Sequence, residues 1–480
     1  MIARVLFVWI AFSIILLLLG LFSQGEPFEF SQVFLAFALS LPVAVSVLRG
    51  GLGDSSDGQL QYPSLSLMVI SAWILMVAPS LIVESQEARY LYHYSDGALT
   101  LARLFFLGWC MLFVVGAGSS RLKELSARPT IIDFIACTAV ALLIVTFLLR
   151  AGLFSNYQSS RTRILPVPGA GTTESIAVVL GTTLFTLMPP LLFLMLLKIQ
   201  SRTSQAVFVF MAFLASWGLL FLLGSRTGVG VAIAGCLLLC RALGMRLRAN
   251  VLIGLSVALP AALVLILVYR SALATSDSDT VTVSHLLSVA SDATSALNDQ
   301  DAQSDALDMV SSNARVRLWY GQQFCVLVDL WLDEGAALRG TLFSNVIAAL
   351  PTFFASDKNA LATELNFEIV MLGTHRFPDI DLAPMPWMQW LYELGLLGLV
   401  IGALLYAWLA RTIEQRVSKT RSFYEIMFWL GLFASMLPPE HTTDSLVLSA
   451  RGGLVYAIVL GSIATALTWL STLGRHERAA

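Results

Sequence analysis

Apolar stretches alternate with short polar segments along most of the chain, and a membrane-spanning α-helix needs about 20 apolar residues. The pattern predicts twelve spans. They cover residues 5–24, 30–48, 64–83, 98–118, 130–149, 174–197, 205–223, 228–242, 250–269, 387–409, 423–438 and 443–471. Only the turn at Ser225–Thr227 separates the seventh span from the eighth, and 205–242 is too long for one helix across a bilayer. The sequence therefore predicts an all-α polytopic membrane protein.

Composition agrees with this pattern. Of 480 residues, 57% are apolar and 12% are charged, whereas soluble domains carry about 25% charged residues. The apolar run at the N-terminus has no A-x-A cleavage site after it, so we interpret it as a retained span and not as a signal peptide. The formal net charge of −2 gives no reason to expect nucleic acid as a partner.

The distribution of basic residues predicts the orientation. If the N-terminus is cytoplasmic, the inside segments carry 16 of the 29 lysines and arginines, and every inside segment contains at least one of them. These segments are 1–4, 49–63, 119–129, 198–205, 241–250, 410–421 and 475–480. Both termini are therefore expected in the cytoplasm.

The remaining basic residues fall on the outside or in adjoining spans, and all except Lys358 are arginines. Arg89, Arg103, Arg150 and Arg270 lie at span ends, where they can reach the interface or pair with nearby acids. Two others stand apart from this group. Arg226 has no acidic residue within ten positions, and Arg451 lies about two turns inside the last span. An ionisable group at such a depth indicates a functional role.

Two outside loops are long. The first, at about 151–173, carries Arg161 and Arg163, which extended chain would place on one side. Its end, PVPGAGTTE, predicts a helix start whose free N–H groups would suit an anion. The second loop covers 270–386, between spans 1–9 (residues 1–269) and spans 10–12 (residues 387–480).

The second loop divides by composition. Residues 271–312 are acidic and rich in small side chains, so we expect them to be mobile. Residues 313–386 are more apolar and are expected to be partly helical, with Arg315 and Gln322 on one side and Arg317 beside them. This part either lies in the membrane interface or covers the helix bundle as an ordinary helix. It ends with His375, Asp379 and Asp381, just before the chain re-enters the membrane.

Several kinds of chemistry have no motif in this chain. There is no P-loop, no H-E-x-x-H, no G-x-S-x-G, and no cysteine spacing typical of a metal site. We therefore expect neither a metal nor a cofactor. The five cysteines are most simply small buried hydrophobes.

Three short motifs resemble those of the bacterial O-antigen ligase and O-antigen polymerase family. They are a Ser-Arg turn between adjacent spans (GSRTGVG, with Arg226), an Arg-x-x-x-Trp element in the large loop (Arg315 to Trp319), and Gln389 followed by E-x-G-x-x-G. The last begins at Glu393 and contains Gly395 and Gly398. The order of the motifs, and about twelve spans with a large late loop, extend the resemblance over most of the chain.

The resemblance implies a membrane glycosyltransferase whose donor is an undecaprenyl-pyrophosphate-linked glycan, at the periplasmic face of the bacterial inner membrane. Its expected partners are the lipid bilayer and, in the same pathway, a chain-length regulator and a flippase. Pyrophosphate would be bound by arginines, whose planar fork suits phosphate. These are Arg226 and Arg315, with Arg161, Arg163, Arg317 and Arg451 sharing the charge. Candidates for the base are Asp381, Asp379 and His375, with Glu440 and His441 behind them.

One departure from the family pattern favours a polymerase. Where the ligases have His-Asn, this chain has Pro384-Met385, so the proposed catalytic histidine of the ligases is absent at that position. The expected activity is polymerisation of lipid-linked repeat units, and ligation to lipid A–core is the alternative. A flippase for the same lipid-linked sugars is a third possibility, which the outward clustering of arginines disfavours. A scaffold without catalysis would leave those arginines unexplained.

Overall fold

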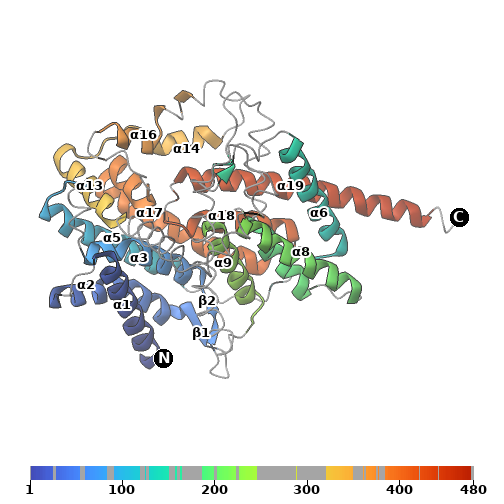
Figure 1. The fold of residues 1–480 in the computed structure, drawn as a ribbon, viewed down its shortest axis with the longest axis horizontal. Coiled ribbons are helices and arrows are strands. Elements are labelled where there is room, and N and C mark those ends of the chain that lie inside the picture. The colour runs from blue at the N-terminus through green and yellow to red at the C-terminus, as the bar shows by residue number, and fades with distance from the viewer. Residues whose placement is uncertain are drawn as a thin grey trace. The chain divides into compact units, whose positions relative to one another are not determined.

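A computed structural model of the chain gives a mostly helical protein with two small β-hairpins (Figure 1). It describes residues 2–24, 29–54, 60–83, 91–118, 125, 129–150, 157–158, 163–164, 186–198, 203–222, 226–245, 288, 320–349, 360–361, 364–374, 377, 384–420, 422–439, 441 and 443–476. Within these residues, six helices are long and apolar enough to cross a membrane, and several shorter apolar helices accompany them. The chain is thus an all-α membrane protein.

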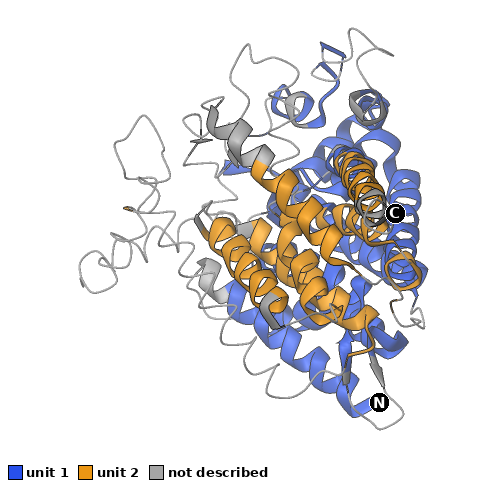
Figure 2. Cartoon of the chain, turned by 90° about the vertical axis from the view of Figure 1, so that its right-hand side faces the viewer, with its two compact units in different colours: residues 1–122, 313–415, 435–451 blue, residues 123–312, 416–434, 452–480 orange. Residues whose placement is uncertain are grey.

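The chain forms two compact units, drawn in different colours in Figure 2. The first unit comprises residues 1–122, 313–415 and 435–451. Its elements are α1 (Ile2–Gln24), α2 (Phe30–Ser46), the π-helical turn η1 (Val47–Gly51), β1 (Leu52–Asp54), β2 (Leu60–Pro63), α3 (Leu65–Ile82), α5 (Asp96–Ala117), α13 (Tyr320–Glu334), α14 (Thr341–Ala349), α16 (Phe367–Leu372) and the first part of α17 (Pro386–Lys419). Strands β1 and β2 pair antiparallel.

The second unit comprises residues 123–312, 416–434 and 452–480. Its elements are α6 (Ile131–Arg150), β3 (Tyr157–Gln158), β4 (Arg163–Ile164), a helix at Thr186–Lys198, α8 (Thr203–Leu222), α9 (Arg226–Ala242), and most of α18 (Phe423–Met436) and α19 (Thr443–His476). Strands β3 and β4 pair antiparallel, with Gln158 opposite Arg163.

Local sequence explains where several helices begin and end. Ser64 accepts a hydrogen bond from the Leu67 N–H and caps α3, and Ser95 does the same for α5 through the Ala98 N–H. Helix α5 ends at Gly118, whose φ of 62° favours glycine. The boundaries of α3 and α5 therefore fall within a few residues of the predicted spans 64–83 and 98–118.

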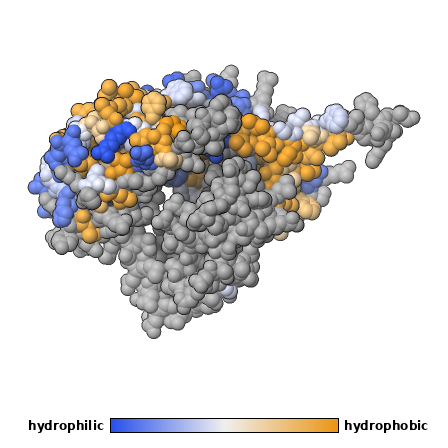
Figure 3. Space-filling view, turned by 90° about the horizontal axis from the view of Figure 1, so that it is seen from above, coloured by the Kyte–Doolittle hydropathy of each residue, from blue (hydrophilic) through white to orange (hydrophobic). Residues whose placement is uncertain are grey.

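The predicted spans coincide with helices wherever their residues are described, whereas 250–269 and the first half of the sixth span, 174–185, lie outside the described residues. The pair 205–223 and 228–242 forms two separate helices, α8 and α9. The predicted span 387–409 lies within α17, which is one of the six candidate spans, although α17 is interrupted at Gly395. Large apolar side chains are exposed along α19, including Leu454, Ile458 and Trp469, and hydrophobic surface follows this helix in Figure 3. Such a surface suits contact with lipid.

The core of the first unit is aromatic. Trp73, at the middle of α3, packs against Trp109 and Phe113 of α5 and against Trp387 and Tyr406 of α17, with ring centroids 4.9 to 6.3 Å apart. The Trp73 indole N–H also donates to the Met436 carbonyl oxygen at 3.1 Å. Aromatic side chains bury large areas, so this cluster holds α17 against α3 and α5.

Candidate functional site

Most side chains predicted to form the site lie outside the described residues. They are those of Arg161, Arg163, Arg226, Arg315, Arg317, His375, Asp379, Asp381 and Glu440. The backbone of two of them is described: Arg163 lies in β4, and Arg226 is the first residue of α9. The side chain of Arg451 is described and is half-buried in α19. The described part of the site is the set of elements around Gln389, Glu393 and Arg451.

Helix α17 folds back on itself at Gly395, forming what we call the α17 hairpin (residues 386–402). Gly395 has a φ of 61° and a ψ of −145°, which is a conformation almost restricted to glycine. A Cβ on Gly398 would lie 2.0 Å from the Trp390 carbonyl oxygen, whereas residues eight apart in one continuous helix are separated by about 12 Å. Gly395 therefore reverses the chain, and Gly398 permits the two limbs to touch.

The first limb of the α17 hairpin begins inside the unit and not at its surface. Trp387 is fully buried and packs against Trp73, at the middle of a helix long enough to cross a membrane. Met385, just before it, is 0% exposed. Non-helical backbone at such a depth is tolerated where protein surrounds it. Pro384-Met385, directly before the hairpin, thus consists of a half-buried and a fully buried apolar side chain.

Glu393 binds backbone in this structure. Its two carboxylate oxygens accept hydrogen bonds from the Gly340 N–H at 2.9 Å and the Thr341 N–H at 2.7 Å. Both groups lie at the start of α14, where free N–H groups and the helix dipole favour a negative charge. The carboxylate is almost fully buried. Glu393 therefore caps α14 and ties the large loop to the α17 hairpin.

The connection between α13 and α14 is strained and tightly held. Leu338 has a φ of 48°, and it is the one non-glycine residue with positive φ among the described residues. The Ala337 N–H donates to the Tyr392 carbonyl oxygen at 2.8 Å, on one side of Leu338, and Glu393 binds Gly340 on the other. Strain of this kind persists only where neighbouring contacts fix the backbone. The exposed Arg339 side chain therefore projects from a fixed backbone position.

Gln389 joins the α17 hairpin to the start of α19. Its amide oxygen accepts a hydrogen bond from the Thr443 N–H at 3.3 Å, and its side chain is almost fully buried. Arg451 lies eight residues further along α19, which corresponds to about 12 Å of helix. Gln389 thus binds the backbone at the start of α19, and Glu393 binds the backbone at the start of α14.

Helix α13 packs against α3 and α5 and is buried along most of its length. The Gly321 N–H donates to the Ser80 hydroxyl at 2.9 Å, and Asp329 accepts from the Ser95 hydroxyl at 2.6 Å. These contacts support the expectation of an ordinary helix covering the bundle over that of an interfacial segment.

Gln322 is a buried amide without a partner. It is 0% exposed, and within the described residues neither its nitrogen nor its oxygen makes a hydrogen bond. Within the described residues, the buried indole N–H groups of Trp109, Trp387 and Trp390 also make no hydrogen bond. Leaving a buried polar group unpaired costs about 1–3 kcal/mol. The interior of the first unit therefore offers donors and an acceptor to a polar ligand or to water.

One arginine at a span end has a structural role. The Arg103 Nε–H donates to the Leu81 carbonyl oxygen at 2.7 Å, at the C-terminal end of α3. A cation at a helix C-terminus is favoured by the helix dipole. This contact with a helix end differs from the expected interface or acid contact of Arg103, while the side chains of Arg89, Arg150 and Arg270 lie outside the described residues.

Sequence reasoning missed Gln322 as an unpaired group, Glu393 as a helix cap and Arg339 as a fixed arginine. Only Arg339 had a signal in the sequence, namely the glycines on either side of it. Gly335 and Gly340 both adopt positive φ. Among the described residues, no group of three histidine, cysteine, aspartate or glutamate side chains is placed to hold a metal ion.

Comparison with family models, with curated proteins and with solved structures finds no match to this chain.

Proposed function

We propose that the protein polymerises undecaprenyl-pyrophosphate-linked oligosaccharide repeats into a surface polysaccharide. In this proposal twelve spans cross the bacterial inner membrane, both termini are cytoplasmic, and the loop at 270–386 is periplasmic. The activity needs neither a metal nor a cofactor and should therefore survive EDTA. The motifs of Arg226, Arg315 and Glu393 carry the resemblance on which the proposal rests.

The observation that carries the proposal is the position of Arg226 as the first residue of α9. A cation at a helix N-terminus opposes the helix dipole, and no acidic residue within ten positions compensates for it. An anion bound there would interact favourably with both the guanidinium and the free backbone N–H groups. A lipid-linked pyrophosphate is such an anion. In the proposed topology, Arg226 lies at the periplasmic surface of the membrane, where this pyrophosphate would also lie.

The reaction needs fixed cations more than it needs an acid. An acceptor hydroxyl attacks the anomeric carbon of the donor glycan, a glycosidic bond forms, and the bond from that carbon to the pyrophosphate oxygen breaks. Undecaprenyl pyrophosphate leaves with the bonding electrons, and arginines stabilise the charge that develops on it. Arg315, Arg161, Arg163, Arg317 and Arg451 are proposed to share this role with Arg226.

The hydroxyl proton requires a base within hydrogen-bond reach. Asp381, Asp379 and His375 remain the proposed candidates, in the segment that leads to the α17 hairpin. Glu393 is a poor candidate, because both of its oxygens are bound to backbone N–H groups. Pro384-Met385, where ligases carry His-Asn, offers no catalytic histidine, which disfavours ligation.

The test is a glycan profile of a strain that lacks the protein, complemented with the wild type, Arg226→Ala or Arg226→Lys. Lipopolysaccharide, secreted polysaccharide and the undecaprenyl-linked pool are analysed together. We expect single repeats on the final acceptor and no long chains with Arg226→Ala. Arg226→Lys should also lose at least about tenfold of the product, because lysine keeps the charge but not the bidentate fork.

Arg411→Ala is the matched control, because Arg411 is an exposed arginine in a predicted inside segment. It should retain the wild-type profile. Full activity of Arg226→Lys would contradict the phosphate role. Long chains stranded on undecaprenyl, with a bare final acceptor, would instead identify a ligase.

A further inference from the structure

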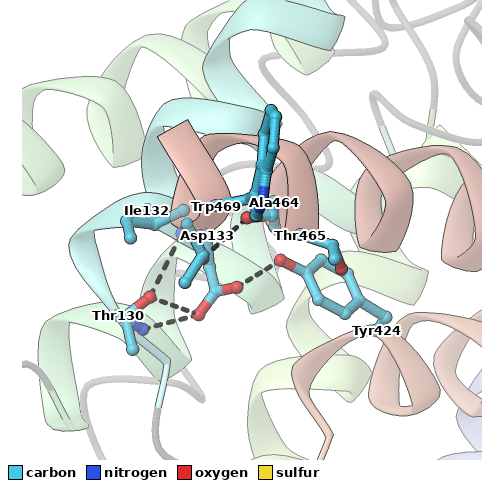
Figure 4. Close-up of a pocket in the computed structure, with 8 residues that line it drawn as sticks. Thr130, Ile132, Asp133, Tyr424, Ala464, Thr465 and Trp469 are labelled. Atoms are coloured by element: carbon cyan, nitrogen blue, oxygen red, sulfur yellow. Dashed lines mark hydrogen bonds between the residues drawn. The ribbon is translucent and has the colours of Figure 1, made fainter. Parts of the chain in front are cut away.

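The second unit contains an open cavity that holds none of the residues predicted from the sequence. It has a volume of about 480 Å³ and lies between the start of α6, the start of α18 and the last part of α19 (Figure 4). We call it the Asp133 cavity. It is lined by Thr130, Ile132, Asp133, Tyr424, Ala464, Thr465, Thr468 and Trp469. Pockets of a few hundred Å³ suit small molecules and headgroups.

A carboxylate is held at the wall of this cavity. One oxygen of Asp133 accepts from the Thr130 N–H at 2.7 Å and from the Thr130 hydroxyl at 2.9 Å, and the other accepts from the Tyr424 hydroxyl. The Asp133 N–H donates to the Thr130 hydroxyl oxygen at 3.4 Å, so the two residues also form a capping box for α6. Asp133 is 9% exposed. Its carboxylate is thus fixed in place, at the edge of open space.

The two threonines that α19 contributes to the cavity already donate their hydroxyl protons within the helix. The Thr465 hydroxyl donates its proton to the Gly461 carbonyl oxygen, and the Thr468 hydroxyl donates to that of Ala464, both at 2.7 Å. The Tyr424 hydroxyl donates its hydrogen bond to Asp133. None of the eight lining residues is basic. A wall with one carboxylate, accepting hydroxyl oxygens and no basic side chain fits a cation that carries several N–H donors.

The location of the cavity indicates a lipid. Each of the three helix ends adjoins a basic segment predicted to be cytoplasmic, namely 119–129, 410–421 and 475–480. The Trp469 side chain is 62% exposed, and tryptophan is enriched at the level of lipid headgroups. A headgroup seated here would place its ammonium group in the cavity, beside Asp133.

We propose that the Asp133 cavity binds the primary ammonium group of a membrane lipid, of the phosphatidylethanolamine type. One N–H group of the ammonium binds the free lone pair of Asp133, and another binds the hydroxyl oxygen of Thr465. A quaternary ammonium lacks these donors, and an anionic headgroup would face the carboxylate. This site is independent of the proposed polymerase activity.

The test is native mass spectrometry of the purified full-length protein, titrated with phosphatidylethanolamine, phosphatidylcholine or phosphatidylglycerol of identical acyl chains. We expect the wild type to prefer phosphatidylethanolamine by at least about tenfold, because the other lipids cannot form the charge-assisted hydrogen bonds. Asp133→Asn should abolish the preference. Thr465→Val, which leaves the α6 cap intact, should reduce it.

Glu425→Gln is the matched control, because Glu425 lies beside Tyr424 in α18 but binds Thr420 and Trp429 and does not line the cavity. It should keep the wild-type preference. Three outcomes would overturn the proposal: equal binding of the three lipids by the wild type, an unchanged preference in both cavity variants, or displacement of the lipid by millimolar free ethanolamine. The last would identify a soluble amine as the ligand.

Discussion

Glu393 shows how a residue in a functional motif can act on structure. Its carboxylate binds the N–H groups of Gly340 and Thr341, at the start of a helix more than fifty residues away in the sequence. A charge-assisted bond to a helix start is stronger than a neutral one. The acid of E-x-G-x-x-G thus ties the start of α14 to the α17 hairpin.

Gln322 permits a test that separates function from stability. Gln322→Leu replaces an unpaired buried amide with an apolar side chain of similar size, so the thermal midpoint in detergent should stay equal or rise by a few degrees. If the amide serves the glycan, long-chain product should fall at least about tenfold in the same variant.

Gln323→Leu provides the comparison, because the Gln323 amide donates to the Tyr92 hydroxyl at 3.1 Å. That variant should lower the thermal midpoint. Wild-type product from Gln322→Leu would exclude a role for this amide in activity.

At the scale of elements, the α17 hairpin is the main departure from a simple bundle. Its first limb is too short to cross a bilayer, since nine residues of helix measure about 13 Å. It nevertheless carries Trp387 into the aromatic core, while Gln389 and Glu393 bind the starts of α19 and α14. One short limb therefore binds the starts of two other helices, α14 and α19.

Replacing the glycine at the turn should destabilise this arrangement. Gly395→Ala forces a side chain into a φ of 61° and places a Cβ 3.2 Å from the Trp331 indole nitrogen. The expected cost is about 1–3 kcal/mol, measured as a lower thermal midpoint in detergent together with loss of polysaccharide.

Gly108→Ala, in the interior of α5, is the control for this change. A Cβ there meets nothing within 4 Å, and alanine is the better helix former by about 0.5–1 kcal/mol. Equal midpoints for the two variants would contradict the account of the hairpin given above.

The sequence predicted the helices well and this reversal not at all, for a physical reason. Hydropathy reports which side chains are apolar. Trp387, Leu391 and Leu399 are apolar and buried here, but their hydropathy is the same for a chain that continues and for one that turns back. The reversal depends on Gly395 and on space beside Trp331, which no periodicity reports. Similarly, the motif of Glu393 was visible, but its partners Gly340 and Thr341 were not, because their approach is a long-range contact.

At the scale of the whole molecule, orientation remains a prediction from the basic residues. Cysteine labelling in spheroplasts can test it with little background, because four of the native thiols are buried and Cys236 is only partly exposed. Lys358→Cys should react with a membrane-impermeant maleimide in intact spheroplasts. Asp57→Cys, in a predicted inside segment, should react only after permeabilisation, and the reverse pattern would invert the topology.

The aromatic core has a consequence for the biogenesis of the protein. Trp73 is synthesised early, yet its hydrogen-bond acceptor Met436 lies 363 positions later and its ring partner Trp387 follows the large loop. While the ribosome is still translating the loop, α3 and α5 are already in the bilayer with their central tryptophans lacking these partners. The order of synthesis and the order of packing therefore differ, and the first unit is completed only when nearly the whole chain has left the ribosome.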